Sequence, residues 1–120
     1  MIVGIDIGGS TTDAVLLNNG EVVVVTIETG DPIAAAAGAL GKLLSTAGGA
    51  LADIRVIAAS GGGARCLQDH LFGVPVVKVP EIVAIGVGGS TLAEKKDALV
   101  VSLGTGTALV SVRGEDIEHV

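Results

Sequence analysis

Two stretches of this chain repeat one pattern, in which an apolar run, a turn rich in glycine and threonine, and a second apolar run follow one another. The first stretch spans residues 2–17 and turns through Gly-Gly-Ser-Thr-Thr, and the second spans residues 97–112 and turns through Gly-Thr-Gly-Thr. Apolar runs on both sides of a short turn predict β-hairpins. Because glycine adopts backbone conformations closed to other residues, such turns let another group approach their amides closely. The pattern therefore favours a sheet with two turns suited to a ligand.

The polar groups of both turns suit an anion, since N–H and O–H donors gathered in a turn bind phosphate. The sequence offers such donors at Gly8, Gly9, Ser10, Thr11 and Thr12 in the first turn and at Gly104, Thr105, Gly106 and Thr107 in the second. Asp6 ends the first strand beside its turn, where a carboxylate is expected if Mg²⁺ lies between it and a phosphate. We therefore predict a phosphate site with Asp6 as its metal ligand, rather than two ordinary surface turns.

Both turns carry a family resemblance. Residues 6–12 resemble the first phosphate motif of the actin, sugar-kinase and heat-shock-chaperone ATPase superfamily, and residues 102–107 resemble its second. Within that superfamily the chain is most similar to type II pantothenate kinases, which place a glycine-rich turn and a Val-Pro-Glu-like acid before the second motif, here residues 61–64 and 79–81. The resemblance implies an α/β, ribonuclease-H-like (actin-like ATPase) domain over residues 1–96, with a mixed sheet and flanking helices, and the opening hairpin of a truncated second domain over residues 97–120.

The same resemblance implies a function. It implies binding of ATP with Mg²⁺ and phosphoryl transfer to the hydroxyl of pantothenate or a related small substrate, a step of coenzyme A biosynthesis. An acid at the place of Glu81 acts as the base in those kinases, although from the residues alone Glu81 is an acid favoured by the dipole of a helix N-terminus. The kinases usually have Lys where Asp13 stands, and nothing in the chain resembles an adenosine pocket, so weak or absent activity is expected.

Two alternatives to a kinase stay open. One is a non-catalytic, minimal or engineered half-domain that self-assembles, and the other is an activator-type ATPase. The last hairpin would present unpaired edges and apolar faces, and such surfaces seek partners, which predicts a homodimer in which terminal segments pack together.

Composition limits the partners and the compartment. A net charge of −6 and 1% aromatic residues argue against nucleic acid and against an anionic membrane surface. Cys66, the sole cysteine of the sequence, allows no internal disulfide, which favours the cytoplasm, and it is expected to be a buried apolar residue. Charged residues and glycines interrupt every apolar run before it reaches membrane-spanning length.

The remaining pattern predicts alternating strands and helices. Asp31 and Pro32 open a helix as N-cap and first residue. Glycines within the second long helix indicate close packing or approach to a ligand, and the turn over residues 61–64 is either part of the ligand cleft or a mere connection. The predicted strands are residues 2–7, 14–17, 21–28, 53–60, 74–79 and the hairpin 98–112, and the predicted helices are residues 33–46, 64–71 and 82–95.

Overall fold

The computed structural model describes residues 1–104 and 106–120. Its elements in chain order are β1 (Ile2–Ile7), β2 (Thr11–Asn18), β3 (Glu21–Glu28), α1 (Pro32–Ala47), η1 (Leu51–Asp53), β4 (Val56–Ser60), η2 (Gly62–Cys66), β5 (His70–Leu71), β6 (Val74–Lys78), α2 (Glu81–Ala93), β7 (Asp97–Leu103), β8 (Thr107–Arg113) and β9 (Asp116–His119). Contacts among them define unit 1 (Met1–Lys78) and unit 2 (Val79–Val120). The division into domains at residues 96 and 97 remains a prediction.

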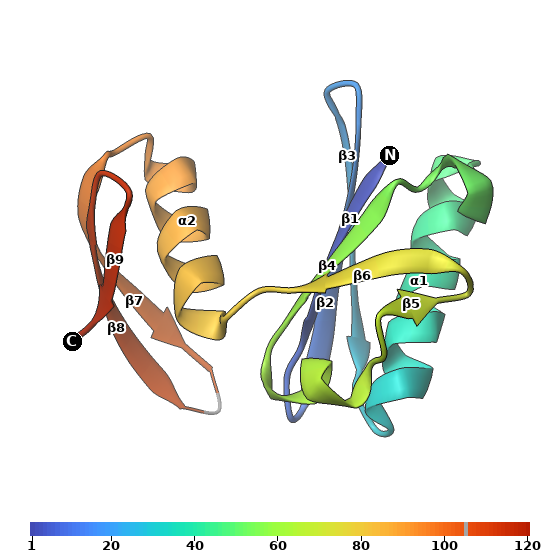
Figure 1. Cartoon of the computed structure of the whole chain (residues 1–120), viewed down its shortest axis with the longest axis horizontal. Helices are drawn as coiled ribbons and strands as arrows, with labels where there is room; N and C mark the ends of the chain where they lie inside the picture. Colours follow the sequence, from blue (N-terminus) through green and yellow to red (C-terminus); the bar gives the residue numbers. More distant parts are fainter. Residues whose placement is uncertain (105) are drawn as a thin grey trace. The chain divides into compact units, whose positions relative to one another are not determined.

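The first six strands form one mixed sheet in the order β3-β2-β1-β4-β6-β5 (Figure 1). The strands β1 and β3 each run antiparallel to β2, which lies between them. The crossover strands β4 and β6 run parallel to β1. The turn between β2 and β3 has positive φ at Asn19 (48°) and Gly20 (86°), as an Asn-Gly hairpin requires. This arrangement confirms the predicted α/β class with a mixed sheet and flanking helices.

The helix α1 begins and ends where its sequence signals stand. The Asp31 side chain accepts a hydrogen bond from the Ala34 amide at 2.9 Å, and Pro32 occupies the first turn, where no amide hydrogen is needed. Gly48 ends the helix with φ 75°, and its amide donates to the Leu44 carbonyl. The helix packs along one face of the sheet, against β1, β2 and β3.

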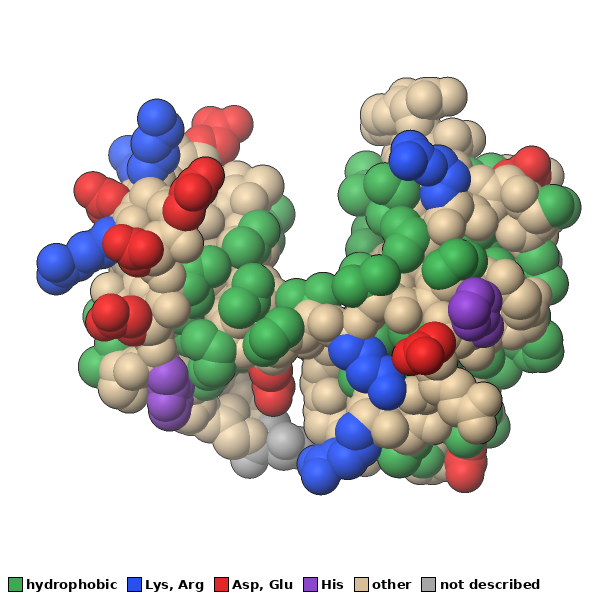
Figure 2. All heavy atoms as spheres, in the orientation of Figure 1, with side chains coloured by type: hydrophobic (Ala, Val, Ile, Leu, Met, Phe, Trp, Pro, Cys, Tyr) green, Lys and Arg blue, Asp and Glu red, His purple; other side chains and the backbone are tan. Residues whose placement is uncertain are grey.

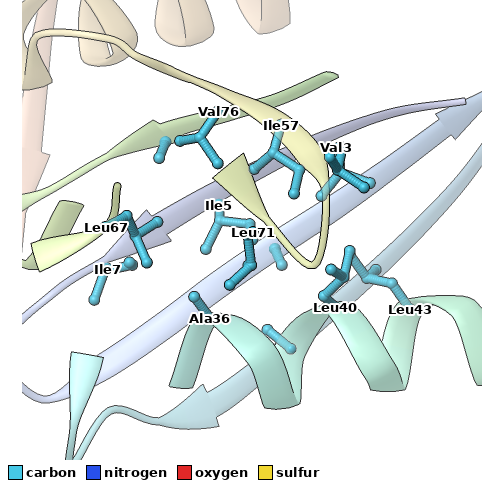
Figure 3. Packing of buried hydrophobic residues seen from close by; sticks show 14 of the residues in the cluster. Val3, Ile5, Ile7, Ala36, Leu40, Leu43, Ile57, Leu67, Leu71 and Val76 are labelled. Carbon is cyan, nitrogen blue, oxygen red and sulfur yellow. The ribbon is translucent and has the colours of Figure 1, made fainter. Parts of the chain in front are cut away.

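The core of unit 1 lies between α1 and this face of the sheet. Every second residue of a strand points to the same face, so alternate positions of β1 meet the helix. Figure 3 shows Val3, Ile5 and Ile7 of β1 in one buried cluster with Ala36, Leu40 and Leu43 of α1. Alanines at Ala36 and Ala39 keep the buried side of the helix small, which lets the helix approach the sheet closely.

Besides the start of β2, two segments of unit 1 differ from their predictions. The strand expected over residues 53–60 begins only at Val56, after the 3₁₀ turn η1. Residues 64–71 do not form a helix: the 3₁₀ turn η2 ends at Cys66, and β5 pairs antiparallel with β6. Phe72 and Gly73 both have positive φ (51° and 81°), so they form the turn of a hairpin. Cys66, expected to be buried, is exposed.

Unit 2 is a helix on a three-stranded antiparallel sheet of order β7-β8-β9. The glycines of α2 bring it close to this sheet. A Cβ built on Gly86 would lie 2.8 Å from Ile117 Cγ2, and one on Gly89 would lie 2.5 Å from Val100 Cγ1, whereas one on Gly88 would meet nothing within 4 Å. Two of the three glycines therefore serve close packing, which was one of the two roles predicted for them.

Both units carry apolar side chains on their surfaces (Figure 2). On the sheet face of unit 1 that α1 leaves open, Leu17, Val22 and Val24 are exposed; in unit 2, Leu99, Val101 and Leu103 of β7 are exposed. Among the described residues, no helix has both the length and the hydropathy of a membrane span.

Candidate functional site

Three loops of unit 1 meet at one edge of its sheet. The strands β1 and β4 are parallel, and β3 runs in the same direction as β1 because each is antiparallel to β2. Their carboxyl ends therefore share an edge, and in open α/β sheets ligands bind at such an edge. The segments that follow these strands are residues 8–10, residues 29–31, and Gly61 with the first residues of η2.

The first of these loops is the turn predicted to bind phosphate. The Gly8 amide donates to the Thr11 carbonyl at 3.0 Å, which closes the hairpin. A Cβ on Gly8 would lie 2.8 Å from the Thr11 carbonyl oxygen, so this close approach excludes any larger residue. Gly9, Ser10 and Thr11 are exposed. These three residues therefore lie at the surface, where an anion can reach them.

Thr12 lies in a different environment from the rest of the predicted site. The strand β2 begins at Thr11, three residues before the predicted start of this strand at residue 14. Thr12 therefore already follows the alternation of the strand and points into unit 1. It has no exposed surface, and its hydroxyl lies 2.9 Å from that of Thr29. The sequence pattern groups the Thr12 hydroxyl with the surface donors of the turn, whereas the structure buries it.

Asp6 stands at the end of β1 on the open face of the sheet. Its partner across the hairpin is Asp13, which lies on the same face and accepts a hydrogen bond from Thr26 of β3 at 2.6 Å. Directly opposed residues of an antiparallel pair have Cβ atoms about 5 Å apart. The two carboxylates therefore add negative charge to one small region of this face.

The glycine turn after β4 packs against the end of β1. Gly61 has φ 85°, and a Cβ there would lie 2.5 Å from both Asp6 Oδ1 and the Ile7 carbonyl oxygen. A Cβ on Gly63 would overlap the Ile7 side chain. The glycines are therefore required by close packing against β1, and the part of this turn in a ligand cleft remains a prediction.

The other predicted site residues belong to unit 2. Glu81 is exposed in the first turn of α2, where its charge is favoured by the helix dipole. The second phosphate turn is closed by a 2.9 Å hydrogen bond from the Gly104 amide to the Gly106 carbonyl, and Gly104, Gly106 and Thr107 are exposed. Thr105 lies outside the described residues.

No group of three or more His, Cys, Asp and Glu side chains that could hold a metal occurs in residues 1–104 and 106–120. The site residue that the sequence reasoning missed is Thr29. It follows β3, is 6% exposed, and bonds to the first turn through both its hydroxyl and its amide. Its sequence signal was slight: a hydroxyl residue between the end of a strand and a Gly-Asp-Pro helix start.

No protein family model matches the chain, and no curated protein sequence matches it. Solved structures do match. With a TM-score of 0.77 and 20% identity, the chain resembles the activator of 2-hydroxyisocaproyl-CoA dehydratase from Clostridium difficile, solved with bound ADPNP, over 98% of this chain and 44% of that one. With a TM-score of 0.80 and 18% identity, it resembles component A of (R)-2-hydroxyglutaryl-CoA dehydratase from Acidaminococcus fermentans, over 98% of this chain and 46% of that one.

A third match is the putative N-acetylglucosamine kinase of Porphyromonas gingivalis, with a TM-score of 0.65, 18% identity, and coverage of 100% of this chain and 47% of that one. The chain thus spans less than half the length of these three proteins. At such identities the likeness shows the fold alone, a mixed α/β fold that this chain shares with part of these two activating components and of this kinase.

Proposed function

We propose that the chain binds the phosphates of ATP, with the exposed turn after β1 as its principal donor. The observation that carries the proposal is the arrangement of Gly9, Ser10 and Thr11 at the surface of a closed turn, next to a carboxylate at the carboxyl edge of the sheet. The chain also shares its fold with the activator of 2-hydroxyisocaproyl-CoA dehydratase, which was solved with bound ADPNP. The same role is proposed for the Gly104–Thr107 turn of unit 2.

The chemistry of Asp6 fits Mg²⁺. This ion prefers oxygen ligands, keeps several waters, and is usually held by one or two carboxylates together with substrate phosphates. A single exposed carboxylate beside a phosphate turn meets that requirement without a cluster of protein ligands. Asp6 would hold the ion, directly or through water, and the ion would offset the charge of the phosphates and of Asp13.

Phosphoryl transfer to a small hydroxyl substrate is the more specific form of this proposal. Glu81 would act as base on the hydroxyl, a modest aid because phosphoryl transfer depends mostly on positioning and charge stabilisation. Pantothenate is the first acceptor to test, since the sequence resemblance alone points to it. A chain that binds no nucleotide at millimolar ATP would be the non-catalytic half-domain, with both turns serving structure alone.

Replacing Asp6 by Asn is expected to weaken binding of Mg²⁺-ATP at least about tenfold, because a charged hydrogen-bonding or metal-binding group contributes more than about 1.5 kcal/mol. The measurement is isothermal titration of the full chain with Mg²⁺-ATP, repeated with EDTA. Asp116→Asn, which removes an exposed carboxylate from β9, serves as the matched control and should bind as the parent does. Absence of heat for the parent at millimolar ATP would refute the proposal.

We also propose that the chain forms a homodimer in the cytoplasm, through the open face of β7. Leu99, Val101 and Leu103 expose 63%, 51% and 80% of their surface on this outer strand, and contiguous apolar surface of this kind marks interaction sites. Val101→Lys is expected to shift the mass in solution from dimer to monomer, measured by light scattering at micromolar concentration. Val24→Lys, on the open face of unit 1, should leave the mass unchanged. A monomeric parent would contradict the proposal.

A further inference from the structure

Two buried threonines and one backbone carbonyl form a continuous hydrogen-bonded chain beneath the first turn. Thr12 and Thr29 expose 0% and 6% of their surface, and their hydroxyl oxygens lie 2.9 Å apart. The Thr29 hydroxyl donates to the Gly8 carbonyl at 2.8 Å. Burying a polar side chain costs free energy unless the side chain is hydrogen-bonded, and both hydroxyls meet this requirement.

Counting hydrogens fixes the direction of this chain. A threonine hydroxyl has one hydrogen to donate, and the one on Thr29 goes to the Gly8 carbonyl. Thr12 must therefore donate to Thr29, because Thr29 has only its lone pairs left for that contact. The single hydrogen of Thr12 is used inside the protein, so this hydroxyl has none to donate to a phosphate.

Thr29 also bonds to the second half of the turn. Its backbone amide donates to the Ser10 carbonyl at 3.0 Å, so one residue holds the carbonyls of both Gly8 and Ser10. All peptide bonds described are trans, and in a trans peptide the C=O and the next N–H point in opposite directions. Directing these two carbonyls toward Thr29 therefore directs the amides of Gly9 and Thr11 away from it.

We propose that Thr29 is the positioning residue of the phosphate turn, with Thr12 acting through it. Thr29 sets the direction of the Gly9 and Thr11 amides, and Thr12 fixes the rotation of the Thr29 hydroxyl by donating to it. This inference rests on the proposed function for its consequence in binding, because aligned amides in a turn are the donors a phosphate meets. Neither threonine touches the ligand.

The test uses the full chain and two readouts. Thr29→Val removes the hydroxyl while keeping the shape, and it is expected to weaken Mg²⁺-ATP binding about tenfold, whereas Thr29→Ser restores binding to within about twofold. In the protein without ligand, Thr29→Val should move the NMR resonances of the Gly9 and Thr11 amides, and Thr29→Ser should leave them in place. The Gly106 amide of the other turn is the internal control.

Thr12→Val supplies a variant that leaves the Thr29–Gly8 hydrogen bond possible. A smaller loss of affinity, about threefold, is expected, and this loss should vanish when Thr29 is already Val, because the two residues act in series. A loss from Thr12→Val as large as that from Thr29→Val would overturn the inference, since Thr12 would then meet the ligand itself.

The two proposals fail in distinguishable ways. If the parent does not bind Mg²⁺-ATP, the proposed function fails, while the amide resonances of the ligand-free variants still decide whether Thr29 positions the turn. If the parent binds and Thr29→Val leaves both its affinity and the Gly9 and Thr11 resonances unchanged, the positioning role is refuted and the phosphate site stands.

Discussion

Replacing Gly61 by Ala is expected to destabilise unit 1 by about 3 kcal/mol or more, by two mechanisms that add. Gly61 has φ 85° and ψ 169°, a backbone region that is essentially confined to glycine. The new Cβ would also lie 2.5 Å from Asp6 Oδ1 and from the Ile7 carbonyl oxygen, and the carbonyl belongs to a buried central strand that cannot move aside. Urea unfolding followed by far-UV circular dichroism measures the effect, since the sequence has no Trp or Tyr.

The neighbouring glycine provides the control. A Cβ on Gly62 would meet nothing within 4 Å, and φ of Gly62 is not positive, so Gly62→Ala should change the free energy of unfolding by less than about 0.5 kcal/mol. Equal effects of the two substitutions would show that the close approach of the glycine turn to β1 is absent in solution. Because Asp6 forms part of that contact, Gly61→Ala should also weaken Mg²⁺-ATP binding, whereas Gly62→Ala should not.

Where local chemistry decides a boundary, the sequence predicts this fold well. Asp31 and Pro32 mark the start of α1, and Gly48 marks its end, because capping depends on residues next to one another in the chain. The Asn19–Gly20 turn likewise sets the β2–β3 hairpin through its own backbone conformation. The crossover from β3 through α1 to β4, parallel to β1, follows from the order of strand, helix and strand.

Where distant residues decide, the prediction is incomplete. The segment from Ala64 to Leu71 has a helical composition, but β5 pairs with β6 instead, and the Val76 amide donates to the carbonyl of Asp69, the residue before β5. No local pattern shows that pairing. The first turn position, at positive φ, is occupied by Phe72 and not by the Asn or Asp that usually signals such a turn.

The candidate site shows the same division. Asp6 and the exposed turn residues could be identified from a short motif, because turn and carboxylate are neighbours in sequence. The inward direction of Thr12 depends on where β2 begins, and the role of Thr29 depends on the pairing of β3 with β2, which places it under the turn. A sequence motif therefore identifies the candidate hydrogen-bond donors of a turn, but it does not show which of them are already hydrogen-bonded to the rest of the protein.

In unit 2, Gly89→Ala is expected to destabilise the packing of α2 on its sheet by about 2 kcal/mol, as overpacking of a well-filled contact does. The added Cβ would lie 2.5 Å and 2.7 Å from the two methyl groups of Val100. Val100 is β-branched and lies within β7, so its side chain has little rotational freedom with which to move aside. Hydrogen exchange of the amides of β7–β9, measured by NMR, reports the stability of this unit separately from unit 1.

Gly88→Ala separates packing from helix propensity. The two glycines are adjacent in α2, and alanine favours a helix over glycine by about 1 kcal/mol at either position. Because a Cβ on Gly88 would meet nothing within 4 Å, Gly88→Ala should slow the exchange of the unit 2 amides, while Gly89→Ala should speed it. Stabilisation by both substitutions would mean that α2 does not contact Val100 in solution, whereas opposite effects would confirm that glycine at position 89 is required by the sheet beneath it.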